Sequence, residues 1–409
     1  MKKIPLIFRR TNSNRLTLPV LFHVLETGGW ERLFDLRLAD SLETMTSAIS
    51  DAETAVIAYS FLTSNLPEVL SEIPSLRAVG EDRIILVAGG PHPVGDPEGT
   101  LKLGFDIVSA GEGEATLPGI CEEVLNHGNT PKKRIFRSDA PIDLDGSFPI
   151  SRTVSPISPL EITRGCFHRC RFCQTGGVPP RHRSLESVKT YLTELRNRGF
   201  LFRAGFISPS GFEYGSEKPG RLSPERLETL LRMAKEIGIE HLEYGIFPSE
   251  VRPNTVHPEF LRLVTAYCAN RKLTIGAQTG SDRLLKRLRR GHTKEDIERS
   301  TALTREHGLT PQLDFILGFP GEAEEEQLRT LDFIRHLGLD YKARIQMHFF
   351  LPLSGTPLEN QEPTFPGKRV TDRLESYHRA GFCSDWWKKG MELSRSIVKI
   401  RRRFAHRND

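Results

Sequence analysis

Strand-like and helix-like runs of residues alternate along most of this 409-residue chain. In its first part, apolar runs at residues 54–60, 83–90 and 106–110 have the composition of buried strands. Helical runs separate them, and a further one follows at 115–125. This βα alternation predicts a doubly wound, Rossmann-like parallel sheet over residues 1–128. In such a sheet, ligands bind outside the carboxyl ends of the strands.

A second series of six βα units runs from about residue 157 to residue 360. Its helices carry start signals, such as Ser223 followed by Pro224, and the pair Thr293 and Asp296. Six units of this size predict an α/β partial TIM barrel, (β/α)6, with its active site at the carboxyl ends of the strands. The strands are expected at residues 160–163, 202–208, 239–247, 272–278, 310–317 and 343–351.

Two polar stretches complete the expected domain organisation. Residues 129–156 are rich in turn-forming residues and are expected to form a linker between the two domains. Residues 361–409 are expected to form a helical extension with an excess of Lys and Arg near its end. No aromatic ladder accompanies these charges, so a solvated helix or tail is favoured and nucleic-acid binding is disfavoured.

Cysteine usage and hydropathy indicate the cellular context. Three of the six cysteines lie within eight residues, which argues against a disulfide framework and for a reducing, cytoplasmic environment. The apolar part of the first ten residues is too short for a signal peptide. No run of 18 or more apolar residues is present, so no membrane span is expected.

Cys166, Cys170 and Cys173 form a C-x3-C-x2-C pattern directly after the first strand of the second series. Gly165 allows the backbone to turn sharply before the first cysteine. Three thiolates in one loop can bind one soft metal centre. Because a cubic [4Fe–4S] cluster normally takes four cysteinates, three of them leave one iron open. The alternative is a zinc site completed by His168 or a distant histidine, in a nucleic-acid-binding protein.

This spacing, with the aromatic Phe172 just before the last cysteine, resembles that of the radical S-adenosylmethionine (SAM) superfamily. In that family the open iron binds SAM, and an electron from the reduced cluster cleaves SAM to a 5′-deoxyadenosyl radical. The resemblance implies a [4Fe–4S] cluster on the three cysteines and SAM as cofactors. It also implies a small-molecule substrate and a one-electron donor of the flavodoxin or ferredoxin type.

Motifs at later strand ends strengthen the resemblance. Residues 208–215 stand where the family has a glycine-rich segment that contacts SAM, although the usual Gly-Gly-Glu is absent. Residues 278–281 and 290–293 resemble the (E/Q)-(S/T)-G-S and R-G-H-T signature of the B12-type subgroup, and residues 318–322 resemble the family's G-F-P-G-E loop. The residues that the resemblance implies in SAM binding are Phe172, Ser208, Ser210, Gln278, Thr279, Ser281, Gly318 and Leu351.

The first domain resembles the cobalamin-binding domain attached to many radical SAM enzymes. The resemblance lies in residues 89–93, with the sequence Gly-Gly-Pro-His-Pro, and in residues 111–114, with Gly-Glu-Gly-Glu. The D-x-H-x-x-G motif, whose histidine ligates cobalt, is missing, so cobalamin would lack that lower ligand. The alternative is a domain of the same fold that binds no cobalamin. The residues implied in cobalamin binding are Ser60, Thr63, Gly89, Gly90, Gly113 and Glu114.

Polar residues follow the third strand of the barrel. Glu250 and Arg252 are candidate catalytic residues, with the alternative that they form an ion pair on the surface. Tyr244 is a candidate radical relay or hydrogen donor, with the alternative that it packs in the core. Arg203, Arg344 and His348 lie on barrel strands and are expected to point inward.

Taken with the resemblance, these features predict a radical SAM enzyme. Cobalamin-dependent methyl transfer to an unactivated carbon is the leading reaction, and a rearrangement or cyclisation without cobalamin is the alternative. A methylthiotransferase is disfavoured, because that family carries a second three-cysteine group near its N-terminus. Here only Cys121 precedes the cluster motif.

Overall fold

The computed structural model describes residues 2–49, 52–80, 82–138, 140–155, 158–200 and 203–405. The chain divides into two compact units. Unit 1 comprises Met1–Ile157, Leu353–Glu359 and Ser396–Asp409, and unit 2 comprises Ser158–Pro352 and Asn360–Arg395. Both units mix helices with parallel strands, which confirms the predicted α/β class.

Unit 1 is built on one sheet in which each paired strand runs parallel to its neighbour. Its strand order is β2-β1-β3-β4-β5-β6, so the chain moves to one edge and then reverses between β1 and β3. This is the doubly wound topology that the sequence predicts. The strands are β1 (Ile4–Arg9), β2 (Phe34–Ala39), β3 (Ala55–Ser60), β4 (Ile84–Gly89), β5 (Ile107–Ser109) and β6 (Ile135–Phe136).

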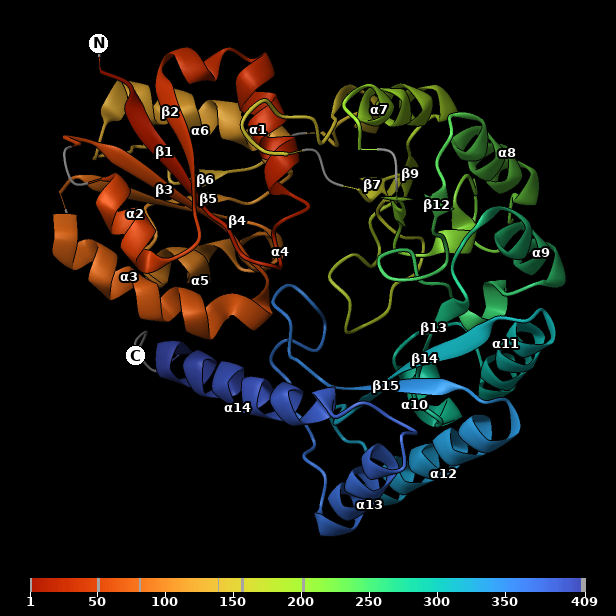
Figure 1. Ribbon diagram of the computed structural model, residues 1–409. Coiled ribbons are helices and arrows are strands. Elements are labelled where there is room, and N and C mark those ends of the chain that lie inside the picture. The colour runs from red at the N-terminus through yellow and green to blue at the C-terminus, as the bar shows by residue number, and fades with distance from the viewer. Residues whose placement is uncertain are drawn as a thin grey trace. The chain divides into compact units, whose positions relative to one another are not determined.

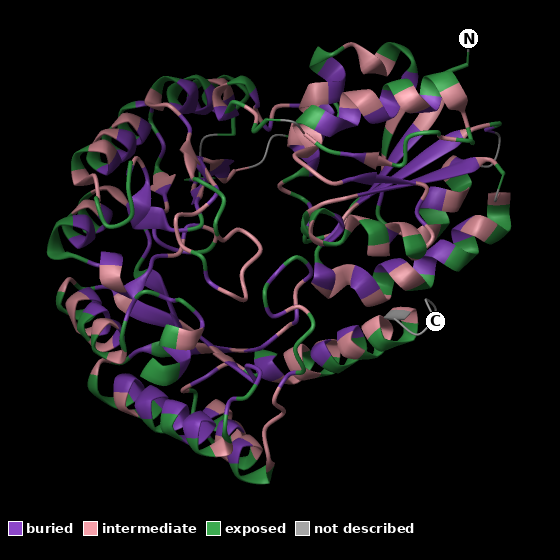
Figure 2. Ribbon diagram, turned by 180° about the vertical axis from the view of Figure 1, so that it is seen from behind, coloured by how far each residue is buried: buried purple, intermediate pink, exposed green. Residues whose placement is uncertain are grey.

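Helices cover both faces of this sheet (Figure 1). Alternate side chains of β1 pack on opposite faces of the sheet, since Leu6 and Phe8 belong to one hydrophobic core and Ile7 to the other. The central strands are buried over most of their length (Figure 2). One face carries α1 (Leu18–Thr27) and α6 (Gly113–His127), and the other carries α2 (Leu42–Ala48), α3 (Leu66–Gly80) and α5 (Pro97–Lys102), with the short α4 (Pro91–Gly95) after β4.

Several elements of unit 1 were not predicted from the sequence, namely β2, α2, α4, α5 and β6, the last within the expected linker. For β2, the reason lies in its position at the edge of the sheet. Its Asp35 and Arg37 pair with each other at 2.5 Å and are more than 40% exposed. An edge strand with charges on its open side lacks the continuous apolar run that identifies β3 and β4.

The segment expected as a linker is fixed to α1 by a buried carboxylate. Glu26 accepts hydrogen bonds from the Ser151 hydroxyl at 2.8 Å and from the Arg152 backbone N–H at 2.7 Å. The side chain of Glu26 is 6% exposed. Part of residues 129–156 is therefore packed into unit 1.

Unit 2 is an arc of parallel strand segments with helices outside it (Figure 1). β7 pairs with β11, β10 pairs with β12, and β13, β14 and β15 form one continuous sheet. A backbone bridge between Val251 and Ile275 joins the region after β12 to β13. The arc has six strand positions, which confirms the predicted partial (β/α)6 barrel.

The elements of unit 2 lie between Leu160 and Ala405. The strands are β7 (Leu160–Glu161), β8 (Thr163–Arg164), β9 (Arg181–His182), β10 (Arg203–Ala204), β11 (Phe206–Ile207), β12 (His241–Leu242), β13 (Lys272–Gln278), β14 (Thr310–Leu317) and β15 (Arg344–Phe349). The helices are α7 (Leu185–Asn197), α8 (Pro224–Glu236), α9 (Pro258–Tyr267), α10 (Asp282–Arg287), α11 (Lys294–Glu306), α12 (Glu324–Asp340), α13 (Lys368–Arg379) and α14 (Trp386–Ala405), the last of which ends in unit 1.

Four predicted strands are shorter or divided in the structure. The strand expected at 160–163 consists of β7 and β8, and the strand expected at 343–351 is shortened to β15. The strand expected at 202–208 consists of β10 and β11, separated by Gly205, and residue 202 lies outside the described residues. The strand expected at 239–247 is reduced to β12. Gly245 adopts a positive φ of 73°, which turns the chain out of the extended conformation.

In the described part of the chain, no helix combines the length and the apolar character that crossing a membrane requires.

Candidate active site

The three cysteines lie on the loop between β8 and β9, an antiparallel pair that closes the base of the loop. The Cys166 backbone N–H donates to the Val178 carbonyl at 2.8 Å. Gly165 opens the loop with a φ of 89°, and a Cβ atom there would lie only 2.6 Å from the Pro179 carbonyl oxygen. The sharp turn predicted at Gly165 is confirmed, and the close approach of the backbone explains why glycine is needed.

Two arginines from distant parts of the chain converge on Cys170. Nη1 of Arg290 lies 3.2 Å from Cys170 Sγ, and Nη1 of Arg252 lies 3.7 Å from the same atom. Both arginines are buried, at 7% and 5% exposure. Arg290 Nη2 also donates to the Gly276 carbonyl at 2.7 Å. Within the described ranges, Nε of Arg290 and both Nε and Nη2 of Arg252 have no hydrogen-bond partner.

Burial and these positive charges act in opposite directions on the thiols. Burial raises the pKa of Cys170, but the charges and hydrogen bonds of Arg290 and Arg252 outweigh burial and bring that pKa below its usual value. For Cys166 burial dominates and raises the pKa to about 11. Burial, reinforced by the charge of Arg252, lowers the pKa of Arg290 to about 10. Cys170 is therefore more readily held as a thiolate than Cys166.

A buried carboxylate holds the loop between the first two cysteines. Nε2 of His168 donates to the two carboxylate oxygens of Glu213 at 2.9 and 3.0 Å. Burial raises the pKa of Glu213, but the hydrogen bond and charge of His168 outweigh burial and hold the pKa below its usual value. Glu213 belongs to the segment 208–215, where the sequence lacks the family's Gly-Gly-Glu. No local pattern reveals that this residue meets a histidine 45 positions earlier.

The two halves of the signature at 278–281 and 290–293 come together at the end of β13. Gln278 has a φ of 73°, which is uncommon for a residue other than glycine. Nε2 of His292 donates to the Ala277 carbonyl at 3.2 Å, and its Nδ1 has no hydrogen-bond partner among the residues that the structure describes. Burial, with the charges of Arg290 and Arg252, lowers the pKa of His292 to about 2, so this ring is neutral.

Of the hydroxyls predicted to bind SAM, those of Ser208, Thr279 and Ser281 are already engaged within unit 2, whereas the buried hydroxyl of Ser210 makes no hydrogen bond of standard geometry among the described residues. Ser281 caps α10, since its hydroxyl accepts from the Leu284 backbone N–H at 3.3 Å, and it donates to Glu326 at 2.9 Å. Thr279 Oγ1 accepts from the Ser281 backbone N–H at 3.3 Å. Ser208 is buried and donates to the Ser210 carbonyl at 3.1 Å. The roles of these residues toward SAM therefore stay predictions.

An aromatic wall stands beside the cysteine loop. The Phe172 ring lies 5.5 Å from the Phe319 ring, which lies 5.5 Å from the Phe350 ring. The backbone N–H of Gly318 donates to a carboxylate oxygen of Glu322 at 2.6 Å. Burial raises the pKa of Glu322 to about 7. The predicted SAM residues Phe172 and Gly318 are thus held by neighbouring loops, and Leu351 lies half-buried after β15.

Titratable side chains occur on β14 and β15 and after β12. Nε2 of His348 lies 3.8 Å from Oδ1 of Asp314, and the His348 ring lies 5.5 Å from the Trp386 ring. Burial raises the pKa of Glu250 to about 7, and the charge of Asp314 adds to this effect. Glu250 can therefore hold or exchange a proton near neutral pH. Asp314 and Glu322 were not recognised from the sequence as site residues.

Two expectations about arginines are wrong. Arg252 does not pair with Glu250 on the surface, because it is buried with its Nη1 on Cys170. Arg203 does not point inward, since its side chain is 62% exposed and pairs with Glu243 at 2.5 Å. Arg203 lies on β10, a two-residue segment too brief for alternation to define a face, and Arg252 follows β12 outside any strand, where alternation gives no guide.

Tyr244 is completely buried. Its hydroxyl donates to the Gly211 carbonyl at 2.5 Å, and its ring lies 6.0 Å from Phe206 and 6.5 Å from Phe212. Burial raises the pKa of Tyr244 well above its usual value. These contacts agree with the alternative that Tyr244 packs in the core. A radical relay through it is only a prediction.

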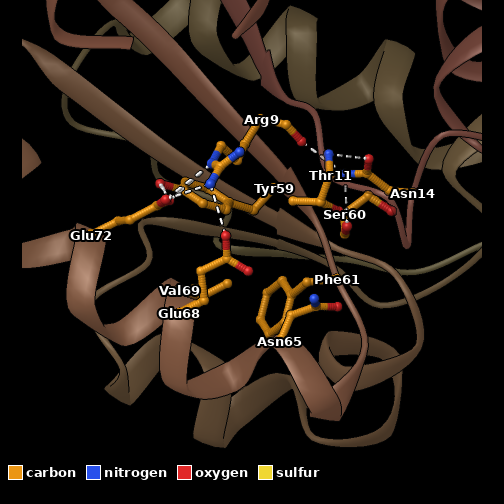
Figure 3. Close-up of a pocket in the computed structure, with 10 residues that line it drawn as sticks. All are labelled: Arg9, Thr11, Asn14, Tyr59, Ser60, Phe61, Asn65, Glu68, Val69 and Glu72. Atoms are coloured by element: carbon orange, nitrogen blue, oxygen red, sulfur yellow. Dashed lines mark hydrogen bonds and ion pairs between the residues drawn. The ribbon is translucent and has the colours of Figure 1, made fainter. Parts of the chain in front are cut away.

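At the carboxyl edge of the unit 1 sheet, the ends of β1 and β3 enclose a small cavity of about 10 Å³ that includes Ser60 (Figure 3). Arg9 donates to Glu72 at 2.7 Å and to Glu68 at 2.8 Å. The Tyr59 hydroxyl donates to Glu72 at 2.8 Å. The charged groups at the β1–β3 reversal are thus bonded to one another, and the cavity has the size of one water molecule.

The segment 353–359 covers a neighbouring part of the unit 1 edge. Oγ1 of the fully buried Thr63 lies 3.1 Å from His92 Nδ1 and 3.4 Å from Ser354 Oγ. Ser354 Oγ donates to the His92 carbonyl at 3.0 Å, and a Cβ atom at Gly95 would collide with the Ser354 carbonyl oxygen. Burial lowers the pKa of His92 to about 4. Thr63 and His92 are therefore engaged within unit 1.

The other residues predicted to bind cobalamin lie along the same edge. Ser60 ends β3 and Gly89 ends β4, in register with each other. Gly90 has a φ of 94° and a Cβ there would lie 2.7 Å from the Phe61 backbone nitrogen. Gly113 and Glu114 begin α6 after β5. The structure thus brings these residues to the carboxyl ends of parallel strands, where doubly wound sheets bind ligands.

The cysteine loop fits an iron–sulfur cluster. Three thiols and two buried guanidiniums with unpaired N–H groups suit an anionic group placed at the loop. Each cysteinate of a cubane binds a different iron, so the sulfurs need not converge on one point. In the described residues, no three His, Cys, Asp or Glu side chains are grouped to hold a single metal ion.

Two family models match the chain. The model of the radical SAM superfamily matches residues 160–334, and the model of the B12 binding domain matches residues 16–121. Both coincide with the site and the edge described above. Residues 160–334 are therefore a domain of the radical SAM superfamily. The chain carries a B12 binding domain in addition, as the sequence motifs predicted.

Curated relatives of this radical SAM protein are distant in sequence. The uncharacterized protein MK0932 of Methanopyrus kandleri is 25% identical over 333 residues, which cover 67% of this chain and 62% of the relative. A tRNA-2-methylthio-N(6)-dimethylallyladenosine synthase of Ralstonia nicotianae is 27% identical over 323 residues, which cover 75% of this chain and 66% of the relative. The chain spans slightly less than two thirds of the length of either protein.

Two solved structures share the fold. The radical SAM methyltransferase TsrM of Kitasatospora setae, solved with cobalamin and a [4Fe–4S] cluster, aligns with a TM-score of 0.63 at 16% identity, covering 88% of this chain and 77% of TsrM. The cobalamin-dependent radical SAM enzyme OxsB aligns with a TM-score of 0.58 at 17% identity, covering 82% of this chain and 52% of OxsB. These likenesses confirm the combination of folds predicted from the sequence.

The two matched domains indicate the cofactors. The radical SAM superfamily uses a [4Fe–4S] cluster and SAM, and the B12 binding domain supports cobalamin as a further cofactor.

Proposed function

We propose that this radical SAM enzyme cleaves SAM reductively and uses the 5′-deoxyadenosyl radical to activate an unactivated carbon of a small molecule, to which a methyl group is transferred with cobalamin as cofactor. The observation that carries the proposal is the cysteine loop of a partial barrel, with Arg252 and Arg290 buried against Cys170. When bound, the reduced cluster supplies the single electron that breaks a carbon–sulfur bond of SAM.

Cys166, Cys170 and Cys173 would hold three irons and leave the fourth open. His168 and Glu213 fix the loop between the first two ligands, because their hydrogen bond of 2.9 Å joins the loop to the turn after β11. The rings of Phe172, Phe319 and Phe350 form an apolar wall. Such a wall excludes water from a site where a radical would otherwise be quenched.

SAM would lie against the carboxyl ends of the barrel strands. The residues proposed to contact it are Phe172, Ser208, Ser210, Gln278, Thr279, Ser281, Gly318 and Leu351. The strained backbone of Gln278 supports a role at this place, because uncommon φ values persist where the surrounding structure enforces them and often mark functional sites. The hydroxyls of Thr279 and Ser281 are engaged, so these two residues would act through backbone groups.

The small-molecule substrate would meet the titratable groups of β14, β15 and the segment after β12. Glu250, with a pKa of about 7, can accept or give a proton at neutral pH. Asp314 and His348 lie within 3.8 Å of each other and can orient a polar group of the substrate. A flavodoxin or ferredoxin is the proposed electron donor.

Cobalamin would be held at the carboxyl edge of the unit 1 sheet by Ser60, Gly89, Gly90, Gly113 and Glu114, and would supply methyl-transfer chemistry. No D-x-H-x-x-G histidine follows β1, and His92 is buried and bonded to Thr63. We therefore propose that the protein supplies no histidine as lower ligand. Thr63 would contribute indirectly, by holding Ser354 and His92.

A reaction without cobalamin is the second candidate. It is favoured by the engagement of Thr63 and His92 with Ser354, which removes two polar groups from the edge where cobalamin would bind. The enzyme would then perform a rearrangement or cyclisation that needs SAM alone. A methylthiotransferase activity is not proposed, because the sole cysteine before residue 166 is Cys121, which is buried.

The cluster assignment is tested by anaerobic reconstitution of the full chain with iron and sulfide. We expect about four irons per chain, and 5′-deoxyadenosine on addition of SAM and a low-potential reductant. The triple variant of Cys166, Cys170 and Cys173 to alanine should lose both. Stoichiometric zinc in place of iron, with salt-dependent binding to nucleic acid, would instead support the zinc protein considered from the sequence.

The cobalamin assignment is tested by the absorbance of reconstituted protein after gel filtration with added hydroxocobalamin. Retention of about one cobalamin per chain supports methyl transfer, and a base-off spectrum unchanged by His92→Ala supports the absence of a histidine ligand. No retained cobalamin, with the cluster intact, favours the reaction that needs SAM alone.

A further inference from the structure

We infer that Arg290 and Arg252 are positioning residues that raise the reduction potential of the cluster by holding positive charge and N–H donors against Cys170. The inference rests on the proposed cluster at the cysteine loop. It concerns how the chain tunes that cluster, and not whether the cluster is there.

The first reason is that neither guanidinium is in an ion pair with a carboxylate of the described residues, although Glu213 lies close enough for its charge to interact with Arg252. No carboxylate of the described residues lies within 4 Å of either guanidinium, although both side chains are more than nine-tenths buried. A buried cation without a counter-charge is costly, and such groups are normally paired. The nearest atom that can carry negative charge is Sγ of Cys170, at 3.2 Å from Arg290 and 3.7 Å from Arg252.

The second reason is that the two arginines are held in place by other parts of the barrel. Arg290 Nη2 donates to the Gly276 carbonyl at 2.7 Å, and the Arg290 guanidinium lies 5.8 Å from the centre of the Phe172 ring. Arg252 precedes a short turn in which its carbonyl accepts from Thr255 Oγ1 at 2.8 Å. The Arg290 guanidinium is therefore anchored by contacts outside the cysteine loop, and the backbone that carries Arg252 is fixed by the turn.

The consequence for the redox equilibrium follows from electrostatics. A cluster with three cysteinates is anionic, and reduction adds one more negative charge to it. Fixed positive charge and N–H donors at a ligand sulfur stabilise the reduced state more than the oxidised state. Removing an arginine should therefore lower the reduction potential. Arg290 should have the larger effect, since it is closer to the sulfur.

The test is an EPR-monitored redox titration of reconstituted full-length protein without SAM. Arg290→Met removes the charge and the donors, Arg290→Lys keeps the charge, and Arg252→Met removes the weaker contact. At the midpoint of the wild type, the ratio of reduced to oxidised cluster should fall about tenfold in Arg290→Met, a shift of about 59 mV for one electron. The shift should be smaller in Arg252→Met and smallest in Arg290→Lys.

Arg299→Gln is the matched control, because Arg299 is exposed on α11 and pairs with Asp296 at 2.8 Å. Its midpoint should equal that of the wild type. Iron and sulfide content is measured for each variant, so loss of the cluster is not mistaken for a change of potential. If Arg290→Met cannot hold a cluster, the midpoint potentials of Arg252→Met and Arg290→Lys still test whether the arginines raise the reduction potential.

Unchanged midpoints in cluster-loaded variants would overturn the inference. Unchanged midpoints together with weaker SAM binding would assign the arginines to SAM instead. A wild type that binds no cluster would refute the proposed function itself, and this outcome is distinguishable because it appears before any variant is made.

Discussion

The imidazole of His168 donates a hydrogen bond to the carboxylate of Glu213 across 2.9 Å. His168 lies between the first two cysteines, and Glu213 lies on the turn after β11. Both side chains are largely buried, at 15% and 6% exposure. The cysteine loop is therefore held by a residue of the barrel as well as by its own turns.

Glu213→Ala should loosen the cysteine loop. The substitution leaves the buried Nε2 of His168 without its acceptor, which costs about 1–3 kcal/mol. We expect a lower free energy of unfolding in urea and a lower iron content after reconstitution. Glu213→Gln keeps an acceptor oxygen and should lose less. Glu236→Ala, at an exposed position of α8, is the control, and an equal loss in this variant would show that the bond to His168 has no special role.

Gly165→Ala should reduce cluster assembly by more than the strain of a positive φ at this position would cause. A Cβ atom at Gly165 would lie 2.6 Å from the Pro179 carbonyl oxygen. Gly199 has a similar positive φ of 78°, but nothing lies within 4 Å of a Cβ placed there. Gly199→Ala therefore reports the backbone strain alone, about 1–2 kcal/mol. Gly165→Ala should cost more in urea unfolding and lose bound iron, and equal losses in the two variants would contradict the collision.

The stability of the protein should depend on pH through Glu322. Its pKa of about 7 in the folded state exceeds its ordinary value of 4.5 because the carboxyl is buried. The stabilisation from this group is thus present below pH 4.5 and is lost as the pH rises through about 7. Relative to Glu322→Gln, the wild type should lose about 3 kcal/mol over this range.

The measurement for Glu322 is the free energy of unfolding in urea at several pH values, for wild type and for Glu322→Gln. Glutamine keeps an oxygen that accepts from the Gly318 backbone N–H, so the comparison isolates the ionisation. Glu325→Gln, at an exposed position of the following helix α12, is the control. A pH-independent difference between wild type and Glu322→Gln would contradict the burial of an ionisable Glu322.

Gly95→Ala should release the segment 353–359 from unit 1. A Cβ atom at Gly95 would collide with the Ser354 carbonyl oxygen, and the displacement would break the contacts of Ser354 with Thr63 and His92. We expect faster limited proteolysis within residues 353–359. Gly146→Ala is the control, since nothing lies within 4 Å of a Cβ there. Equal cleavage of both variants would show that the close approach at Gly95 does not hold the segment.

Much of the fold could be predicted because local signals and tertiary structure agree. β13 and β14 have the predicted bounds, and α11 begins at the predicted cap, where the Thr293 hydroxyl accepts from the Asp296 backbone N–H at 3.3 Å. The edge strand β2 could not be predicted in this way. Its polar residues face outward, so its identity depends on pairing with β1.

In the candidate site, too, features that are contiguous in sequence could be predicted and long-range contacts could not. The cysteine motif is contiguous in sequence, so its spacing alone indicated the ligands. The contacts of Cys170 with Arg252 and Arg290 span 82 and 120 residues, and no local pattern encodes them. The contact between the Thr63 and Ser354 hydroxyls joins residues 291 positions apart and could not be predicted from the sequence either. Long-range polar contacts of this kind become evident only in the folded chain.

The central claim is that three cysteines leave one iron of a [4Fe–4S] cluster open to SAM. The measurement that tests it most directly is the EPR spectrum of the dithionite-reduced, reconstituted protein before and after SAM is added. We predict the signal of a reduced [4Fe–4S] cluster whose g-values change with SAM, and no such signal when Cys166, Cys170 and Cys173 are all alanine. A cluster signal that SAM leaves unchanged, or a protein that takes up zinc and no cluster, would contradict the account.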